Sequence, residues 1–142
     1  MAETNTIQVR LVTPERILVD QTVNAVEVPG KSGYLEVLYG HAPLLSELGA
    51  GEVRLHGGEG GEQRFHVARG FVEVLPERVT ILAESAVKPE DIDTGEAKEE
   101  LEEGKKLWSE AGEDAEKYDE ANELIREAES LLESAQGGQK QG

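Results

Sequence analysis

The sequence predicts an α+β protein, with an N-terminal antiparallel β-sandwich over residues 1–88 and a C-terminal αα-hairpin over residues 89–135. Before the boundary, short apolar segments alternate with turn residues; beyond it, apolar residues recur every three or four positions, as on one helix face. The charge changes at the same place: residues 1–90 hold 8 basic and 13 acidic side chains, and residues 91–142 hold 6 and 17. Pro89 cannot continue a strand ladder, so it marks the boundary.

The first half contains many short segments with strand character. Ile7, Val9 and Leu11 alternate with polar residues, which is the period of a half-buried strand. The glycine-rich stretch 57–61 predicts a flexible hairpin tip, because a phosphate loop would continue with Lys-Ser or Lys-Thr and a helix. Strand segments at a spacing of about 8–12 residues predict a sandwich or barrel. The further segments are 16–19, 22–28, 34–38, 52–56, 64–68, 71–75 and 79–84.

The second half contains two amphipathic helical patterns. Gly112 is suited to the end of the first helix and Asp114 to the N-cap of the second, so a tight turn joins them. Residues 136–142 carry no apolar anchor, and we expect them to form a disordered tail. The first apolar stripe contains Ala97, Leu101 and Trp108, the last of which we expect in the hairpin core; the second contains Tyr118, Ala121, Ile125, Ala128, Leu132 and Ala135.

The composition excludes several classes of function. A formal net charge of −16 opposes binding to nucleic acid and to anionic membrane surfaces. The chain has no cysteine, and its three histidines are too scattered for a local metal motif. There is no run of 18 apolar residues and no signal-peptide layout at the N-terminus, so we expect neither a membrane span nor export.

No catalytic constellation is recognisable in the sequence. Ser46 and Ser85 lack the context of a nucleophile elbow, and the glutamates lie mostly in the helical half, where a solvated helix face explains them. We therefore expect an interaction subunit rather than an enzyme, with no catalytic residue, no metal and no cofactor.

Five strings, in their order and spacing, resemble the epsilon subunit of F-type ATP synthases, which is called delta in mitochondria. They are VTPER (12–16), GYLEVLYGHAPLL (33–45), LGAGEVR (48–54), GFVEV (70–74) and VTILAESA (79–86). The resemblance covers residues 7–88, and the family also places a helical hairpin after its sandwich. Four positions differ from the family's usual residues: Glu36 and Arg69 stand where glycine is usual, Tyr39 where proline is usual, and Tyr34 where an acidic residue is common.

The resemblance implies a non-catalytic rotor subunit of the central stalk, peripheral to the cytoplasmic face of the bacterial plasma membrane. Its sandwich would dock on the gamma subunit and on the polar loops of the c-ring. We place the c-ring contact in residues 31–42 and expect Tyr34, Tyr39 and His41 at the c-ring or gamma interface. The apolar residues of that segment are expected in the core: Leu35, Val37 and Leu38.

The resemblance also raises two possible roles for the hairpin. Some relatives bind ATP there through a motif Ile/Leu-Asp-x-x-Arg-Ala and a further arginine; here only Asp93 matches among the charged positions, and Glu96 and Glu103 replace the two cations. We therefore expect no nucleotide site. In bacterial relatives the second helix can reach the catalytic beta subunit and block ATP hydrolysis. With eight acids against Lys117 and Arg126 over residues 114–135, we expect weak inhibition.

An alternative outside this family is an unrelated acidic β-sandwich that serves as an adaptor or a ligand-binding module. Surface aromatic residues on a flat sheet would favour carbohydrate as the ligand, but Phe and Tyr together number only five. Co-purification with a gamma-like subunit would separate the two interpretations.

Overall fold

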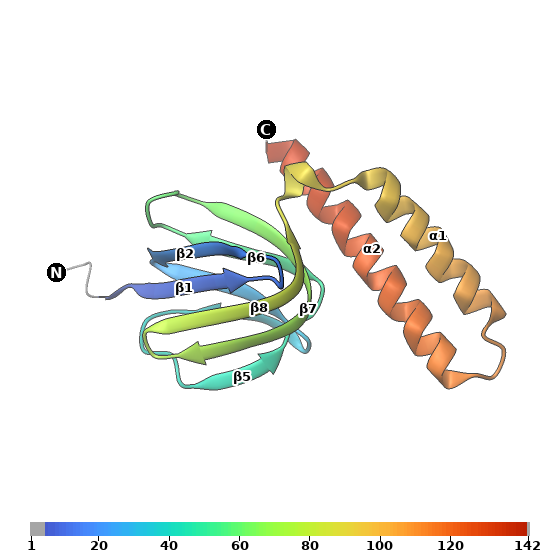
Figure 1. Ribbon diagram of the computed structural model, residues 1–142, viewed down its shortest axis with the longest axis horizontal. Coiled ribbons are helices and arrows are strands. Elements are labelled where there is room, and N and C mark those ends of the chain that lie inside the picture. The colour runs from blue at the N-terminus through green and yellow to red at the C-terminus, as the bar shows by residue number, and fades with distance from the viewer. Residues whose placement is uncertain (1–4, 142) are drawn as a thin grey trace. The chain divides into compact units, whose positions relative to one another are not determined.

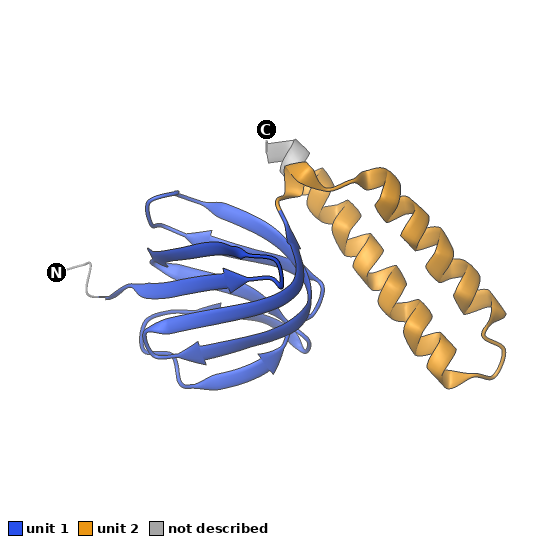
Figure 2. Cartoon of the chain, in the orientation of Figure 1, with its two compact units in different colours: residues 1–87 blue, residues 88–142 orange. Residues whose placement is uncertain are grey.

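The computed structural model describes residues 5–141, with side chains described as far as residue 137. The chain divides into two compact units, Met1–Val87 and Lys88–Gly142, which are coloured separately in Figure 2. The division lies one residue before the boundary that the sequence predicts. The first unit holds all the strands and the second unit both long helices.

The first unit is a sandwich made by a single hydrogen-bonded sheet that folds over on itself (Figure 1). The strand order is β2-β1-β8-β7-β6-β3-β4, and β5 pairs with β7 beside this path. All strand pairs are antiparallel except β1 with β8, which run parallel. The predicted sandwich is therefore confirmed, with one parallel pair inside it. The strands are β1 (Ile7–Val12), β2 (Ile17–Val23), β3 (Ala25–Gly30), β4 (Gly33–Val37), β5 (Leu44–Glu47), β6 (Gly51–His56), β7 (Gln63–Leu75) and β8 (Arg78–Val87).

Strand β7 joins the two layers of the sandwich. The sequence predicts two strands, 64–68 and 71–75, whereas the structure has one strand of 13 residues. Its first part pairs with β6 and its second part with β5, and the inward-facing residues change from Phe65 and Val67 to Val72 and Val74. The change of face falls at Arg69 and Gly70, both of which have positive φ. A Cβ at Gly70 would lie 1.9 Å from the carbonyl oxygen of Leu82, so only glycine fits there.

Two further strand assignments differ from the prediction. The segment 22–28 is divided at Asn24, whose backbone N–H donates to the carbonyl of His56 at 2.8 Å, so β2 ends and β3 begins there. Strand β5 was not predicted, because its four residues follow Pro43 and alternate too briefly to show a period. The strand forms because these four residues pair with the second part of β7, which is distant in the sequence.

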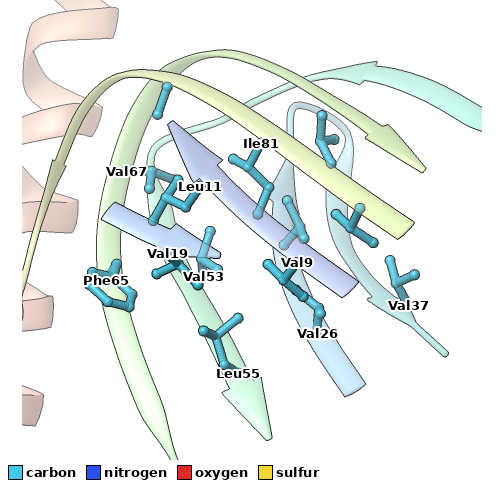
Figure 3. Packing of buried hydrophobic residues seen from close by; sticks show 14 of the residues in the cluster. Val9, Leu11, Val19, Val26, Val37, Val53, Leu55, Phe65, Val67 and Ile81 are labelled. Carbon is cyan, nitrogen blue, oxygen red and sulfur yellow. The ribbon is translucent and has the colours of Figure 1, made fainter. Parts of the chain in front are cut away.

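The core of the first unit consists almost entirely of aliphatic side chains. Val9, Val26, Leu55 and Ile81 come from four different strands and meet between the layers (Figure 3). The alternation of Ile7, Val9 and Leu11 predicted a half-buried strand, and all three are buried. Val37 also lies in the core as expected, whereas Leu38 is half exposed, because β4 ends at Val37 and the chain leaves the sheet.

The second unit is a helical hairpin, and this prediction is confirmed. It consists of a short helix η2 (Pro89–Asp91), α1 (Thr94–Glu110) and α2 (Ala115–Gln141). Small residues seven positions apart are buried along both long helices: Ala97 and Gly104 on α1 with Ala111 at its C-cap, and Ala121, Ala128 and Ala135 on α2. A seven-residue repeat keeps one face of each helix toward its partner. A Cβ at Gly104 would lie 2.8 Å from Ile125 Cγ1, so this glycine permits the close approach of the two helices.

The helix ends follow the predicted capping pattern. Asp114 Oδ1 accepts from the backbone N–H of Glu116 at 3.0 Å, and Gly112 has the left-handed φ of +59°. Trp108 is half exposed rather than buried in the hairpin core, and its ring packs edge-on against Tyr118 at 5.4 Å.

The predicted disordered tail at 136–142 is wrong for residues 136–141, because α2 continues through Gln141. Once a helix is nucleated, each added residue gains one backbone hydrogen bond, and no proline interrupts this stretch. Gly142 lies outside the described residues.

Candidate docking surfaces

Tyr34, the first predicted interface residue, lies at the start of β4 and has a structural role. Its side chain is 53% exposed, yet its hydroxyl accepts from the backbone N–H of Glu52 at 2.8 Å. The Arg54 guanidinium lies 5.8 Å from the centre of the Tyr34 ring. Tyr34 therefore ties β4 to β6 across β3, while one side of its ring faces solvent.

Tyr39 and His41 lie beyond the other end of β4. Tyr39 is 51% exposed, and the ring Nδ1 of His41 lies 2.6 Å from the carbonyl oxygen of Ala42. Between them, the N–H of Gly40 donates to the carbonyl of Pro76 at 2.7 Å, so this segment is held against the β7–β8 turn. Tyr39 and His41 therefore lie beyond the last residue of β4, whereas Tyr34 lies near its first residue.

A row of apolar side chains crosses the outer face of the sheet, and the sequence pattern alone does not predict it. Phe71 is paired with Leu82, Leu82 with Val12, and Val12 with Ile17, so one residue comes from each of β7, β8, β1 and β2. Phe71, Leu82 and Ile17 are 50%, 52% and 54% exposed. We call these four residues the apolar row.

Acidic side chains border the apolar row. Glu47 is paired with Phe71, and Glu73 and Glu84 flank Phe71 and Leu82 two positions along their strands. An apolar centre with a charged rim is the usual anatomy of a protein interface. The only signal in the sequence was the polar alternation of 71–75 and 79–84, and it did not show that the outward residues of four strands come together.

A buried ion cluster lies on the outer side of β6 and β7. The carboxylate of Glu52 is almost fully buried and accepts from Arg54 Nε at 3.1 Å and from Arg64 Nε at 3.0 Å. His66 is paired with Glu52 and is also buried; burial lowers the pKa of its ring to about 4, although the Glu52 carboxylate opposes this. The two guanidinium groups compensate the charge of the buried carboxylate, and the pair between Glu52 and Arg64 links β6 with β7.

The remaining observations concern chemistry and membranes. Among the described residues, no group of three or more His, Asp or Glu side chains is placed to hold a metal ion. No helix within residues 5–141 has the length and apolar character needed to cross a bilayer. Asp93, the one charged match to a nucleotide motif, is the N-cap of α1, since its Oδ1 accepts from the N–H of Glu96 at 3.0 Å.

Comparison with known families decides between the interpretations that the sequence leaves open. Residues 6–89, which include every strand of the sandwich, match the beta-sandwich domain of the ATP synthase Delta/Epsilon chain. The chain belongs to the ATP synthase delta/epsilon chain family. The resemblance that the sequence motifs indicate is confirmed, and an unrelated sandwich adaptor is excluded.

Relatives in this delta/epsilon family include three bacterial proteins named ATP synthase epsilon chain. The one from Koribacter versatilis is 44% identical over 95 residues, which cover 67% of this chain and 66% of that relative. The one from Solibacter usitatus is 45% identical and covers 69% and 72%; the one from Mesorhizobium japonicum is 38% identical and covers 73% and 77%. The chain thus spans just under two thirds of the length of the Koribacter relative.

Solved structures similar to this delta/epsilon chain support the fold. A chain from the Euglena gracilis mitochondrial ATP synthase, solved with OSCP, F1 and the c-ring, has a TM-score of 0.76 at 23% identity and covers 91% of this chain and 81% of its own length. A chain of the central stalk and c-ring of the Tetrahymena thermophila enzyme has a TM-score of 0.68 at 12% identity and covers 91% and 96%.

Proposed function

We propose that this chain is a non-catalytic rotor subunit of the central stalk of an F-type ATP synthase. Membership of the delta/epsilon family supports this, together with the absence of a catalytic constellation in the sequence. In this role the sandwich is a rigid joint that transmits torque, because its core is closely packed while its loops and outer faces carry the contacts. The subunit is peripheral to the membrane, on the cytoplasmic face in a bacterium.

The apolar row is the observation from which we propose which residues of the sandwich contact a partner. A row of half-exposed apolar side chains is unfavourable in water, and it is stabilised when a partner covers it. We assign the row to the gamma subunit and infer that the gamma surface is apolar with a polar rim, since Glu47, Glu73 and Glu84 surround the row and two of them pair with Lys31 and Arg69.

The experiment measures the affinity of the full chain for purified gamma subunit. Phe71→Asp with Leu82→Asp places two charges in the row and should weaken binding by at least about tenfold, because buried interface anchors cost about 2 kcal/mol or more when lost. Thr22→Asp is the matched control: it adds a charge on an exposed position of β2 away from the row, and binding should remain unchanged. Unchanged binding by the double variant would remove the row from the gamma interface.

We assign the c-ring contact to the segment 31–42, with Tyr39 and His41 as its exposed residues and Tyr34 at its other end. Tyr39→Ala with His41→Ala removes both side chains without disturbing the bond between Gly40 and Pro76, which is made by the backbone. We expect weaker retention of the subunit on c-ring-containing membranes and unchanged affinity for gamma. The opposite pattern would move these residues to the gamma interface.

The hairpin is assigned a weak regulatory role at most. If α2 meets an acidic loop of the catalytic beta subunit, its excess of acidic residues over basic ones disfavours the contact. Deletion of residues 88–142 should therefore leave ATP hydrolysis by the assembled complex nearly unchanged. A several-fold rise in hydrolysis would show that the acidic hairpin inhibits.

Calorimetry with millimolar ATP and magnesium should detect no saturable binding to the full chain.

A further inference from the structure

His56 lies between two carboxylates that come from different parts of the first unit. It is the last residue of β6, and its ring Nε2 lies 2.5 Å from Glu27 Oε2 on β3. On the other side, its Nδ1 lies 2.5 Å from Glu62 Oε1, at the far end of the β6–β7 connection. One imidazole ring therefore links the glycine-rich tip, residues 57–62, to the neighbouring strand.

This geometry favours the charged form of the His56 ring. A neutral imidazole has one donor nitrogen and one acceptor nitrogen, whereas an ionised carboxylate only accepts. With a carboxylate oxygen at hydrogen-bond distance from each nitrogen, a charged ring can donate to both carboxylates, whereas a neutral ring can donate to only one. The hydrogen bonds to Glu27 and then to Glu62 raise the pKa of His56 above its ordinary value of 6.5, although partial burial opposes them.

The charged groups around His56 come from each neighbouring element. Glu27 belongs to β3, Glu62 to the tip, and Arg54 to β6, where its guanidinium lies 3.4 Å from Glu27 Oε1. Arg54 therefore pairs with Glu27 and also with Glu52, whose Oε1 lies 3.1 Å from Arg54 Nε. Loss of the proton from His56 would leave a nitrogen lone pair facing a carboxylate oxygen, and that contact is repulsive.

Besides the contact with His56, the tip packs against the β2–β3 turn, where Gly57 lies against Asn24 and Gly58 against Thr22 and Val23. Gly57, Gly58 and Gly61 have φ of +81°, +84° and +67°, a region that glycine enters freely but that gives no stiffness. Inside the tip, the N–H of Gly61 donates to the carbonyl of Gly58 at 3.2 Å, and the N–H of Gly57 donates to Glu62 Oε2 at 3.3 Å. The second of these bonds depends on the same Glu62 carboxylate that His56 holds.

We propose that His56 is a proton-dependent clasp that orders the tip 57–62 when its ring is charged and releases it when the ring loses its proton. The tip lies at the same end of the sandwich as the β7–β8 turn and the segment between β4 and β5 (Figure 1). Backbone hydrogen bonds connect the two regions through their neighbours, from Gly40 to Pro76, from Gln8 to Glu77, and from Asn24 to His56. The clasp thus makes the order of one loop at this end depend on pH, whether or not the segment 31–42 contacts the c-ring.

The test follows the mobility of the tip in the full chain as the pH is raised. Because the chain has no cysteine, Glu59→Cys gives a single site for a nitroxide spin label in the middle of the tip. Between about pH 5.5 and about pH 9, the spectrum should change from a slow to a fast component. The midpoint should coincide with the titration of the His56 ring followed by NMR, and should lie above 6.5.

Three variants separate the clasp from other causes. With His56→Asn the label should be mobile at every pH, and with Glu62→Gln, an exposed change that keeps the fold, the transition should move to lower pH. His41→Asn should leave it unchanged, and a label at Glu113, in the unit that contains no histidine, should show no transition. The proposal is overturned if the tip label does not respond to pH, if its transition survives His56→Asn, or if His56 titrates at or below 6.5.

Discussion

At the residue scale, Arg69 shows how a single backbone angle shapes the sandwich. Its φ is +58°, and it is the one residue other than glycine with positive φ in the described chain. A side chain in this left-handed region costs about 1–2 kcal/mol. The ion pair between Arg69 Nε and Glu84 Oε1, at 3.2 Å, is exposed on both sides and offsets little of that cost. The turn that lets β7 change layers is therefore strained at this position.

Arg69→Gly should be more stable than Arg69→Ala by about 1 kcal/mol. Both variants lose the arginine side chain and its contacts, so the difference isolates the backbone conformation. Urea unfolding of the full chain measures both. Equal stability of the two variants would show that Arg69 is not strained.

His66 is the second residue with a measurable effect on stability. Because burial lowers its pKa to about 4, the folded protein keeps the ring neutral at a pH where the unfolded chain, with a pKa of 6.5, already binds a proton. The stability that this neutral ring contributes is present above pH 6.5 and is lost as the pH falls from 6.5 toward 4. The shift corresponds to about 3 kcal/mol.

The free energy of unfolding of the wild type and of His66→Gln should therefore converge, or change order, as the pH is lowered. Relative to the variant, the wild type should lose about 3 kcal/mol between pH 7 and pH 4. His41→Gln is the control, and its difference from the wild type should vary little over the same range. A constant difference between the wild type and His66→Gln would mean that His66 titrates normally.

At the element scale, the helical hairpin depends on small residues rather than on large apolar ones. Glycine inside a helix costs about 1 kcal/mol against alanine, so Gly95 and Gly104 both weaken α1 by propensity alone. Their surroundings differ. A Cβ at Gly95 would meet only Asp93 Oδ1, at 3.3 Å, whereas a Cβ at Gly104 would meet Ile125 Cγ1 at 2.8 Å and Leu124 Cβ at 3.2 Å. At Gly104 a larger side chain would gain helix propensity but would collide with α2, and we expect the collision to be the larger effect.

Gly95→Ala should raise the stability of the hairpin by about 0.5–1 kcal/mol, and Gly104→Val should lower it by about 1–3 kcal/mol through overpacking. Trp108 is the single tryptophan and packs on Tyr118 between the helices, so its fluorescence reports on the unfolding of the hairpin. A stabilising effect of Gly104→Val would contradict the close packing of the two helices.

At the scale of the whole molecule, the two units have separate cores. Every residue of the aliphatic cluster lies within residues 1–87, and the seven-residue repeat of small residues lies within residues 88–142. A single core of this size is enough for a small domain to fold, though with modest stability. The first unit also contains the whole apolar row. We therefore expect this unit to fold and to bind gamma without the hairpin.

Residues 1–87 alone should therefore unfold cooperatively in urea, with a β-type far-UV circular dichroism spectrum, and should bind gamma as tightly as the full chain. The comparison uses the same two measurements on the full chain. A truncated chain that lacks a cooperative transition would show that the sandwich needs the hairpin. A folded one that fails to bind would move the gamma contact out of the first unit.

The sequence by itself determined the class of each half and the family. Alternation in Ile7, Val9 and Leu11 and helical spacing after Pro89 depend on neighbours in the chain, and so do the caps at Gly112 and Asp114. Such local signals can be read without knowing which elements meet. The motifs in residues 33–45 and 70–74 are also short stretches of consecutive residues. The family match confirms the delta/epsilon family that they indicate.

The tertiary structure decided which side chains come together. The apolar row needs the register of three strand pairs, one of them parallel, and the clasp at His56 needs Glu27 from a strand 29 residues earlier. The three predicted interface residues lie within eight positions of one another in the chain, yet β4 holds Tyr34 at one end and Tyr39 and His41 beyond the other. Chain proximity does not predict spatial proximity in a sheet, because each strand carries the chain about 3.3 Å per residue away from where it began.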